Sequence, residues 1–240
     1  MRLTAEGLAG ERGGEEIFSG VSFSLDAGQC LIVTGENGAG KSTLLRIVAG
    51  LLPPAGGSIS FDPGSAASPP LGPSLKGEGG VTVSESPSPL RGGVRGGGID
   101  ATGLDEFSNL QSAAHYLGEK NAMKAAMTVA ENLAFRQKFL GHPFHTVDEA
   151  LDAIDLPTVA NLPFGYLSTG QRRRVAIAGL LVSYRPVWLL DEPTAGLDLG
   201  SERRFADLMR GHLEDGGIII AATHAPLDIE GAKELEMGAS

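Results

Sequence analysis

The sequence predicts an α/β fold built on a mostly parallel β-sheet. Stretches with strand periodicity alternate along the chain with stretches of helical periodicity, and this alternation is typical of parallel sheets with crossover helices. Several predicted strands are short, apolar and rich in β-branched residues, as expected for strands buried on both faces. A glycine-rich loop directly follows one of these strands and leads into a helix, which is the context in which α/β proteins bind phosphate groups.

The first part of the chain supplies three predicted strands and one helix. Residues 21–25 and 58–61 alternate between apolar and polar side chains, which predicts half-buried strands. Residues 30–34 (CLIVT) form a short apolar run, which indicates a buried strand. Residues 41–50 follow helical spacing and end at Gly50, and two prolines shortly after it prevent the helix from continuing.

Helices and buried strands alternate in the second part of the chain. Two helices are expected to begin at Thr128 and Thr146, whose hydroxyls suit an N-cap, and Glu149 completes a capping-box pattern with Thr146. Residues 187–190 (VWLL) and 217–223 (GIIIAAT) are apolar runs that predict buried strands. An amphipathic helix is expected between these two strands.

Residues 63–98 do not follow this pattern. Sixteen of these 36 residues are glycine or proline, and the segment contains no aromatic residue. Such a segment buries too little apolar surface to offset the entropy lost on ordering. We expect residues 63–98 to be a disordered surface insert within one domain that covers residues 1–240. A glycine-rich functional loop is the alternative, but no catalytic spacing supports it.

Composition and charge limit the classes of function. The chain has 240 residues, of which 42% are hydrophobic and 20% charged, as in ordinary globular proteins. Its net charge of -10 argues against non-specific nucleic-acid binding. Cys30 is the only cysteine, which excludes an intramolecular disulfide and a cysteine-rich metal site. The amino terminus has no apolar leader region and no apolar run approaches a membrane span, so we expect a cytoplasmic protein that does not itself cross a membrane.

The glycine-rich loop GENGAGKS matches the phosphate-binding P-loop pattern G-x-x-x-x-G-K-[ST]. Its glycines allow backbone N–H groups to converge on phosphate oxygens, and the following helix adds partial positive charge. Lys41 is expected to reach the β- and γ-phosphates and Ser42 to bind Mg²⁺. The residues predicted to contact the nucleotide here are Gly35, Glu36, Asn37, Gly38, Ala39, Gly40, Lys41, Ser42 and Thr43. A turn that ends in Lys-Ser by chance is the structural alternative.

A second motif, VWLLDEP, places Asp191 at the carboxyl end of an apolar strand, where ligands of open α/β sheets bind. Asp191 is expected to hold Mg²⁺ through its water shell. Glu192 is the adjacent carboxylate and is expected to orient or deprotonate the water that attacks the γ-phosphate. An acidic turn after a strand would explain this motif if it stood alone, but the P-loop makes that explanation weaker.

The motifs GENGAGKS, LSTGQRRR, LLDEP, AGLD and AATHAP together resemble the ATP-binding subunits of ABC transporters. They occur in that family's order and cover nearly the whole chain except the insert. The resemblance implies an ABC-type P-loop ATPase with a small helical subdomain at about residues 122–180. It identifies residues 167–171 (LSTGQ) as the signature segment, which in this family closes over the nucleotide held by the P-loop of a second subunit.

The resemblance also implies the partners and the catalytic residues. We expect a homodimer in the ATP-bound state, with MgATP as substrate, Glu192 as base, and Lys41 and His224 as charge-stabilising residues. The signature residues expected to contact the partner's nucleotide are Ser168, Gly170 and Gln171. Physically, a serine hydroxyl, a glycine N–H and a helix N-terminus form an anion site, whereas a plain N-cap would account for Ser168 alone.

Three longer stretches resemble one subfamily within the ABC transporter ATPases. The stretches 8–25, 115–135 and 216–227 resemble the ATP-binding subunit of the haem exporter of cytochrome c maturation. This implies a peripheral protein on the cytoplasmic side of the bacterial inner membrane, bound to a membrane permease. A soluble ABC ATPase of iron–sulfur cluster assembly and a non-hydrolysing nucleotide-binding scaffold are the alternatives.

Two positions depart from the family pattern. Where most relatives have a glutamine that touches Mg²⁺, the corresponding stretch YLGEKN offers Lys120 or Glu119 and no glutamine. A cation there would be repelled by the metal, but it could meet a phosphate. Arg12 stands where many relatives place an aromatic residue on adenine, and its guanidinium plane could stack on a base or simply be solvated. Residues 172–174 (RRR) are interpreted as the solvated first turn of a helix with no separate chemistry.

Overall fold

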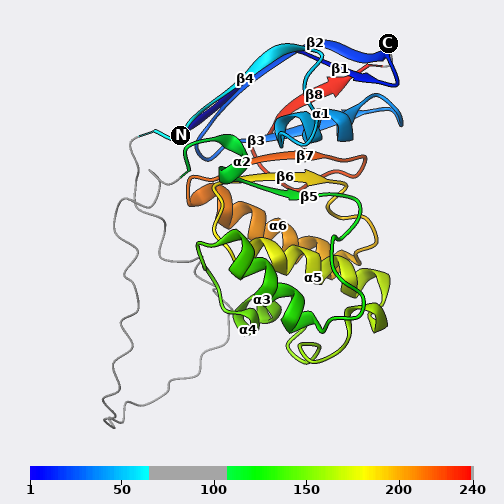
Figure 1. Ribbon diagram of the computed structural model, residues 1–240, viewed down its shortest axis with the longest axis vertical. Coiled ribbons are helices and arrows are strands. Elements are labelled where there is room, and N and C mark those ends of the chain that lie inside the picture. The colour runs from blue at the N-terminus through cyan, green and yellow to red at the C-terminus, as the bar shows by residue number, and fades with distance from the viewer. Residues whose placement is uncertain (65–106, 239–240) are drawn as a thin grey trace.

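The computed structural model describes residues 1–64 and 107–238, and it confirms the α/β fold with a mostly parallel core sheet (Figure 1). Five parallel strands form the central sheet in the order β5-β6-β7-β3-β8. Three antiparallel strands form a second sheet in the order β2-β1-β4. Nearly all of the predicted insert, from residue 65 onward, lies outside the described residues.

The strands and helices have the following bounds. The central sheet contains β3 (Cys30–Gly35), β5 (Ala114–Leu117), β6 (Val187–Asp191), β7 (Ile218–Ala222) and β8 (Lys233–Met237). The second sheet contains β1 (Arg2–Arg12), β2 (Glu15–Asp26) and β4 (Gly56–Asp62). The helices are α1 (Lys41–Val48), α2 (Leu110–Ala113), α3 (Val129–Leu140), α4 (Val147–Ala153), α5 (Thr169–Leu181) and α6 (Leu199–Glu214), with a 3₁₀ turn at Phe164–Tyr166.

The helix starts follow from local chemistry that the sequence already contains. Thr128 caps α3 and Thr146 caps α4, and in each case the glutamate three residues later returns a hydrogen bond to the cap backbone. Such a box satisfies two of the N–H groups that a helix start leaves unpaired. At the other end of α1, Gly50 adopts a φ of 69° and terminates the predicted helix.

The central sheet divides the apolar core into two parts. Figure 1 shows α1 and the antiparallel sheet on one side, and α3 to α6 on the other. Strand β6 serves both parts, because Val187 and Leu189 pack toward α1 while Trp188 and Leu190 pack toward α5 and α6. All five β6 residues are buried, which explains its continuous apolar run. Burial of one such leucine contributes about 1.5–3 kcal/mol relative to an exposed position.

Two strands were not predicted from the sequence, the central strand β1 of the antiparallel sheet and the edge strand β8 of the central sheet. Strand β1 runs between β2 and β4, and its pairing with β2 shifts register at several positions, so its side-chain alternation is interrupted. Strand β8 (KELEM) carries mostly charged side chains and pairs only with β3 in the described part of the chain. It is an edge strand, where polar side chains remain in solvent.

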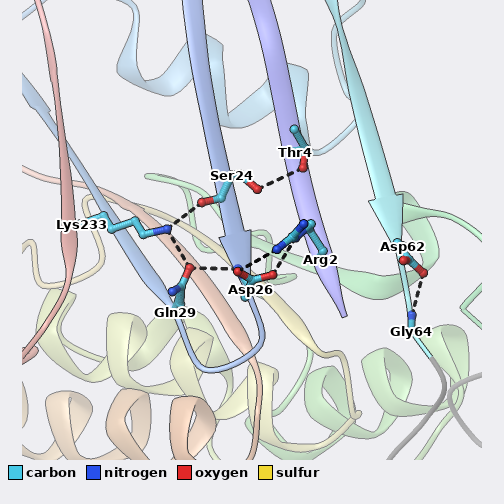
Figure 2. Close-up of polar contacts among 8 residues, drawn as sticks. All are labelled: Arg2, Thr4, Ser24, Asp26, Gln29, Asp62, Gly64 and Lys233. Atoms are coloured by element: carbon cyan, nitrogen blue, oxygen red, sulfur yellow. Dashed lines mark hydrogen bonds and ion pairs between the residues drawn. The ribbon is translucent and has the colours of Figure 1, made fainter.

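A polar network joins the antiparallel sheet to this edge strand (Figure 2). The Lys233 ammonium donates to the Ser24 carbonyl oxygen and to Gln29 Oε1, both at 2.8 Å. The same Gln29 oxygen accepts the Asp26 N–H at 3.0 Å. Asp26 in turn accepts from Arg2 Nε at 2.7 Å across the β1–β2 pair. The network therefore fixes β2 relative to β8 on the outside of the P-loop strand β3.

The predicted helical region, residues 122–180, contains α3, α4 and nearly all of α5. Helix α5 packs against α3, α4 and β5, and its residues from Val175 onward are buried on every side. None of the helices within residues 1–64 and 107–238 is long and apolar enough to cross a membrane.

Candidate functional site

The P-loop connects the carboxyl end of β3 to the start of α1. Its glycines at 35, 38 and 40 have φ values of 138°, 90° and 94°, which side chains with a Cβ rarely adopt. At Gly35 a Cβ would also overlap the backbone oxygen of Met237 on β8. Gly40 is the N-cap of helix α1 and offers no side chain to cap it. Its first-turn N–H groups can therefore serve an anionic ligand.

Three residues predicted to be catalytic come together at this loop. Lys41 is buried, and its Nζ donates to the carbonyl oxygens of Gly35 at 2.8 Å and Glu36 at 3.0 Å. The same Nζ lies 3.0 Å from His224 Nε2. Because an ammonium can only donate, Nε2 is the acceptor and the ring proton lies on Nδ1. Glu192 Oε1 is 3.6 Å from the same histidine nitrogen, so all three side chains face one point.

The two predicted metal residues also meet. Ser42 Oγ donates to Asp191 Oδ1 at 2.8 Å, although 149 positions separate them in the chain. Asp191 is only 2% exposed. Serine and carboxylate oxygens are hard donors that suit Mg²⁺, which usually takes one or two protein ligands and completes its shell with water and phosphate. Within the described residues there is no group of three or more His, Cys, Asp or Glu side chains that could hold a metal, and a Mg²⁺ site of this type does not need one.

Tyr116 completes the environment of Asp191 and was not predicted. Its hydroxyl donates to Asp191 Oδ2 at 3.1 Å, so each carboxylate oxygen accepts a side-chain hydroxyl. Burial and the nearby Asp191 charge raise the pKa of Tyr116, which keeps it a donor at neutral pH. The contact arises because β5 pairs with β6 in a register that places Tyr116 opposite Leu189, two residues before Asp191. No local sequence pattern reveals that pairing.

Glu192 has an unusual backbone conformation. Its φ is 45°, and holding a non-glycine residue in such a region costs on the order of 1–3 kcal/mol. Two hydrogen bonds hold it there: its N–H donates to the Ala222 oxygen at 2.8 Å, and its own oxygen accepts from Arg173 Nη2 at 2.7 Å. The candidate base is therefore fixed by both the neighbouring strand β7 and the signature helix α5.

The signature segment begins α5, on the opposite side of the central sheet from α1 (Figure 1). Ser168 and Gln171 form a capping box with each other, so the structural explanation of Ser168 as an N-cap holds. Gly170 lies against the loop after β6, since a Cβ at Gly170 would come within 3.0 Å of the Gly196 oxygen. Ser168 is exposed and Gly170 and Gln171 are half-buried, and their contact with a nucleotide remains a prediction.

The interpretation of residues 172–174 as a solvated turn is wrong for Arg173. This side chain is 3% exposed. It donates to the carbonyl oxygens of Gly118, Asp191, Glu192 and Pro193 at 2.7 to 2.9 Å, and it approaches Asn121 Oδ1 at 3.4 Å. The reason is topological: the first turn of α5 lies under the carboxyl ends of β5 and β6, where these carbonyls need donors.

The other predicted site residues occupy less constrained positions. Arg12 is exposed at the end of β1, opposite Glu15 in the hairpin. Lys120 is exposed in the loop after β5. Asn37 is exposed in the P-loop, whereas Ala39 is buried and donates its N–H to the Glu36 oxygen at 3.2 Å. Thr43 is half-buried in the first turn of α1.

Comparison with protein families matches residues 18–195 to the ABC transporter family. Two curated relatives carry the name "Cytochrome c biogenesis ATP-binding export protein CcmA". The one from Mesorhizobium japonicum is 54% identical over 99% of this chain and 98% of its own length. The one from Brucella abortus is 50% identical over 97% of this chain and 89% of its own length.

Solved structures support the same fold. The cbiO1 protein from Clostridium perfringens, part of an ABC transporter complex, matches with a TM-score of 0.62 at 27% identity, over 93% of this chain and 78% of that chain. The dimeric structure of an ATP-binding cassette bound to ADP and Pi matches with a TM-score of 0.66 at 20% identity, over 93% of this chain and 88% of that chain. At that identity the second likeness concerns the fold alone.

Proposed function

Because this chain belongs to the ABC transporter family of ATP-binding proteins, we propose that it is the ATP-hydrolysing subunit of a bacterial exporter of cytochrome c biogenesis. The observation that carries the proposal is the meeting of Lys41, His224 and Glu192 beside the Ser42–Asp191 pair. These side chains come from three separate segments of the chain: the start of α1, the end of β6 and the loop after β7. Their meeting at the P-loop is what hydrolysis of a nucleoside triphosphate requires.

Nucleotide binding begins with the P-loop. Its N–H groups and the start of α1 surround the phosphates, and Lys41 exchanges the Gly35 and Glu36 oxygens for phosphate oxygens. Ser42 and Asp191 would hold Mg²⁺, which when bound neutralises charge on the β- and γ-phosphates. Tyr116 keeps the Asp191 carboxylate oriented through its second oxygen.

Hydrolysis is an in-line attack of water on the γ-phosphate. Glu192 accepts the proton of the attacking water, and its fixed backbone holds the carboxylate in position to receive that proton. Lys41 and His224 Nε2, 3.0 Å apart, stabilise the charge that spreads over the γ-phosphate oxygens. His224 can do so as a donor once Lys41 has turned toward phosphate and a proton has moved to Nε2.

The second phosphate-binding segment acts on another nucleotide. Ser168 and Gly170 lie at the start of α5, across the central sheet from the P-loop of their own chain. We assign them to the γ-phosphate held by a second copy, so that a head-to-tail homodimer contains two composite sites. Each site then uses the P-loop, Asp191 and Glu192 of one copy and the signature of the other.

The export role rests on the named relatives. We assign haem as the cargo whose handling is coupled to hydrolysis, and a membrane permease as the partner. The chain would then work as a peripheral subunit on the cytoplasmic side of the inner membrane.

Phosphate release from the purified protein tests the enzymatic part of this proposal. The wild-type protein should hydrolyse ATP in the presence of Mg²⁺. Glu192→Gln keeps the shape of the side chain and removes its basicity, so hydrolysis should slow by about 10²-fold or more, while ATP binding persists and a dimer accumulates on gel filtration. Normal hydrolysis by a monomeric Glu192→Gln protein would contradict the assigned role.

A further inference from the structure

Arg173 is the most completely bonded side chain outside the residues assigned to catalysis. A guanidinium has five N–H donors, and Arg173 makes five hydrogen bonds with them: one from Nε, two from Nη1 and two from Nη2. All the acceptors are neutral oxygens, four of them backbone carbonyls. Burial lowers its pKa, yet an arginine remains charged inside proteins.

The five acceptors belong to two loops of the ATP site. Asp191, the metal aspartate, ends β6, and Glu192, the base, begins with Pro193 the turn that follows it. Gly118 and Asn121 belong to the loop after β5, which carries Lys120. Arg173 itself belongs to a third element, α5, five residues after the helix cap Ser168. One side chain therefore joins both loops to the signature helix.

The contacts of Arg173 matter because the head-to-tail dimer contains two composite ATP sites, an arrangement that rests on the proposed function. The loops held by Arg173 serve the nucleotide of their own subunit, whereas the start of α5 serves the nucleotide of the other. Five residues of α-helix span about 7.5 Å, a short and rigid path. We propose that Arg173 is a positioning residue that fixes Glu192 relative to the signature segment of the same chain and so links the two ATP sites of the dimer.

The chain offers a matched control on the same turn. Arg174 is half-buried, and its Nη1 makes only long contacts, 3.4 Å to the Ile154 oxygen and 3.3 Å to the Asp155 oxygen. Neither of these acceptors belongs to the two loops that Arg173 holds. Arg173→Lys keeps the charge but has three donors instead of five, so it cannot hold all the acceptors at once. Arg174→Lys makes the same chemical change away from the site.

The test uses tagged heterodimers in which Glu192→Gln silences one site. In the first arrangement the partner is Glu192→Gln, and Arg173→Lys lies in the subunit that supplies the surviving Glu192. In the second, Arg173→Lys and Glu192→Gln share one subunit, which supplies only the signature of the surviving site. The reference is a heterodimer of wild-type and Glu192→Gln subunits.

We expect kcat to fall at least tenfold in the first arrangement and at least threefold in the second, with nucleotide affinity of the variant within twofold of wild type. Hydrogen exchange should accelerate at residues 192–197 and 118–121 while the rest of the fold stays protected. Arg174→Lys should leave both arrangements at the reference rate. If kcat in the second arrangement equals that of the reference, Arg173 does not link the two sites. If kcat in the first arrangement equals that of the reference, Arg173 does not position the base.

Two further measurements keep the proposal testable. If Arg173→Lys does not fold, Asn121→Ala removes only the side-chain acceptor and should lower kcat about twofold in the first arrangement, since it loosens the longest of the five bonds. An unchanged rate there would count against the proposal. Wild-type ATP hydrolysis is measured in the same series, so failure of the proposed function would appear as an inactive reference rather than as an unchanged variant.

Discussion

Tyr116→Phe is the sharpest probe of Asp191, the aspartate that we propose holds Mg²⁺, because it removes one oxygen atom and leaves the ring in place. The lost hydrogen bond runs from the hydroxyl to Asp191 Oδ2 at 3.1 Å. Hydrogen bonds to charged groups contribute about 1.5–3 kcal/mol, and Asp191 is buried, so little water can replace the donor. For a domain of this size each kcal/mol shifts the melting temperature by about 2–4 °C, which predicts a loss of roughly 3–12 °C.

The same change should alter the use of metal. An aspartate held by Ser42 alone can rotate, so the Mg²⁺ site is less well preorganised. A loss of about 1.4 kcal/mol in binding free energy corresponds to a tenfold weaker affinity for Mg²⁺. We therefore expect the Mg²⁺ concentration for half-maximal hydrolysis to rise about tenfold, measured by phosphate release at saturating ATP. Tyr184→Phe is the control, since Tyr184 is a half-buried tyrosine beside Trp188 and His212 and away from Asp191. Unchanged melting and unchanged Mg²⁺ dependence in Tyr116→Phe would refute the reasoning.

Two other predictions concern charge. Lys120 is exposed, so its ammonium should point away from the metal, and Lys120→Gln should leave nucleotide affinity little changed, whereas a steep rise in the Mg²⁺ requirement would place Lys120 in the metal site. Burial lowers the pKa of His212 to about 3. Below pH 6.5 this histidine is therefore protonated in the unfolded chain but stays neutral in the folded chain. The contribution of neutral His212 to stability should therefore be complete above pH 6.5 and decline as pH falls toward 3, by at most about 1.4 kcal/mol per pH unit. His212→Phe should flatten this slope in urea unfolding followed by fluorescence of Trp188, the only tryptophan and the stacking partner of His212, and an unchanged slope would assign it to other groups.

Local chemistry allowed much of the fold to be predicted from the sequence. The N-caps at Thr128 and Thr146 follow from a threonine and a glutamate three residues apart. The apolar runs at 30–34 and 187–190 correctly predicted buried strands. Strand β8 could not be found this way, because its charged side chains face solvent and only pairing with β3 makes it a strand.

In the candidate site too, residues in local motifs were predicted and residues that depend on distant contacts were not. The motifs placed Lys41, Ser42, Asp191, Glu192 and His224 in one centre, because each lies at the end of a parallel strand or the start of a helix. Tyr116 and Arg173 were not predicted, because their partners are distant in sequence: Tyr116 bonds to Asp191 at the end of β6, and Arg173 bonds to the loops after β5 and β6. An arginine in a run of three looks solvated in the sequence, and only the packing of α5 beneath β5 and β6 buries the middle one.

The most direct test of the central claim is a mixing experiment with two inactive proteins. Lys41→Ala removes the ammonium that we propose binds phosphate, and Ser168→Arg fills the signature segment with a bulky cation. In a mixed dimer both changes fall on the same composite site, so the other site retains an intact P-loop and an intact signature. We expect each protein alone to be nearly inactive and phosphate release to return in part on mixing. Full activity of Ser168→Arg alone, or no recovery in a mixture shown to contain heterodimers, would contradict a site shared between two copies.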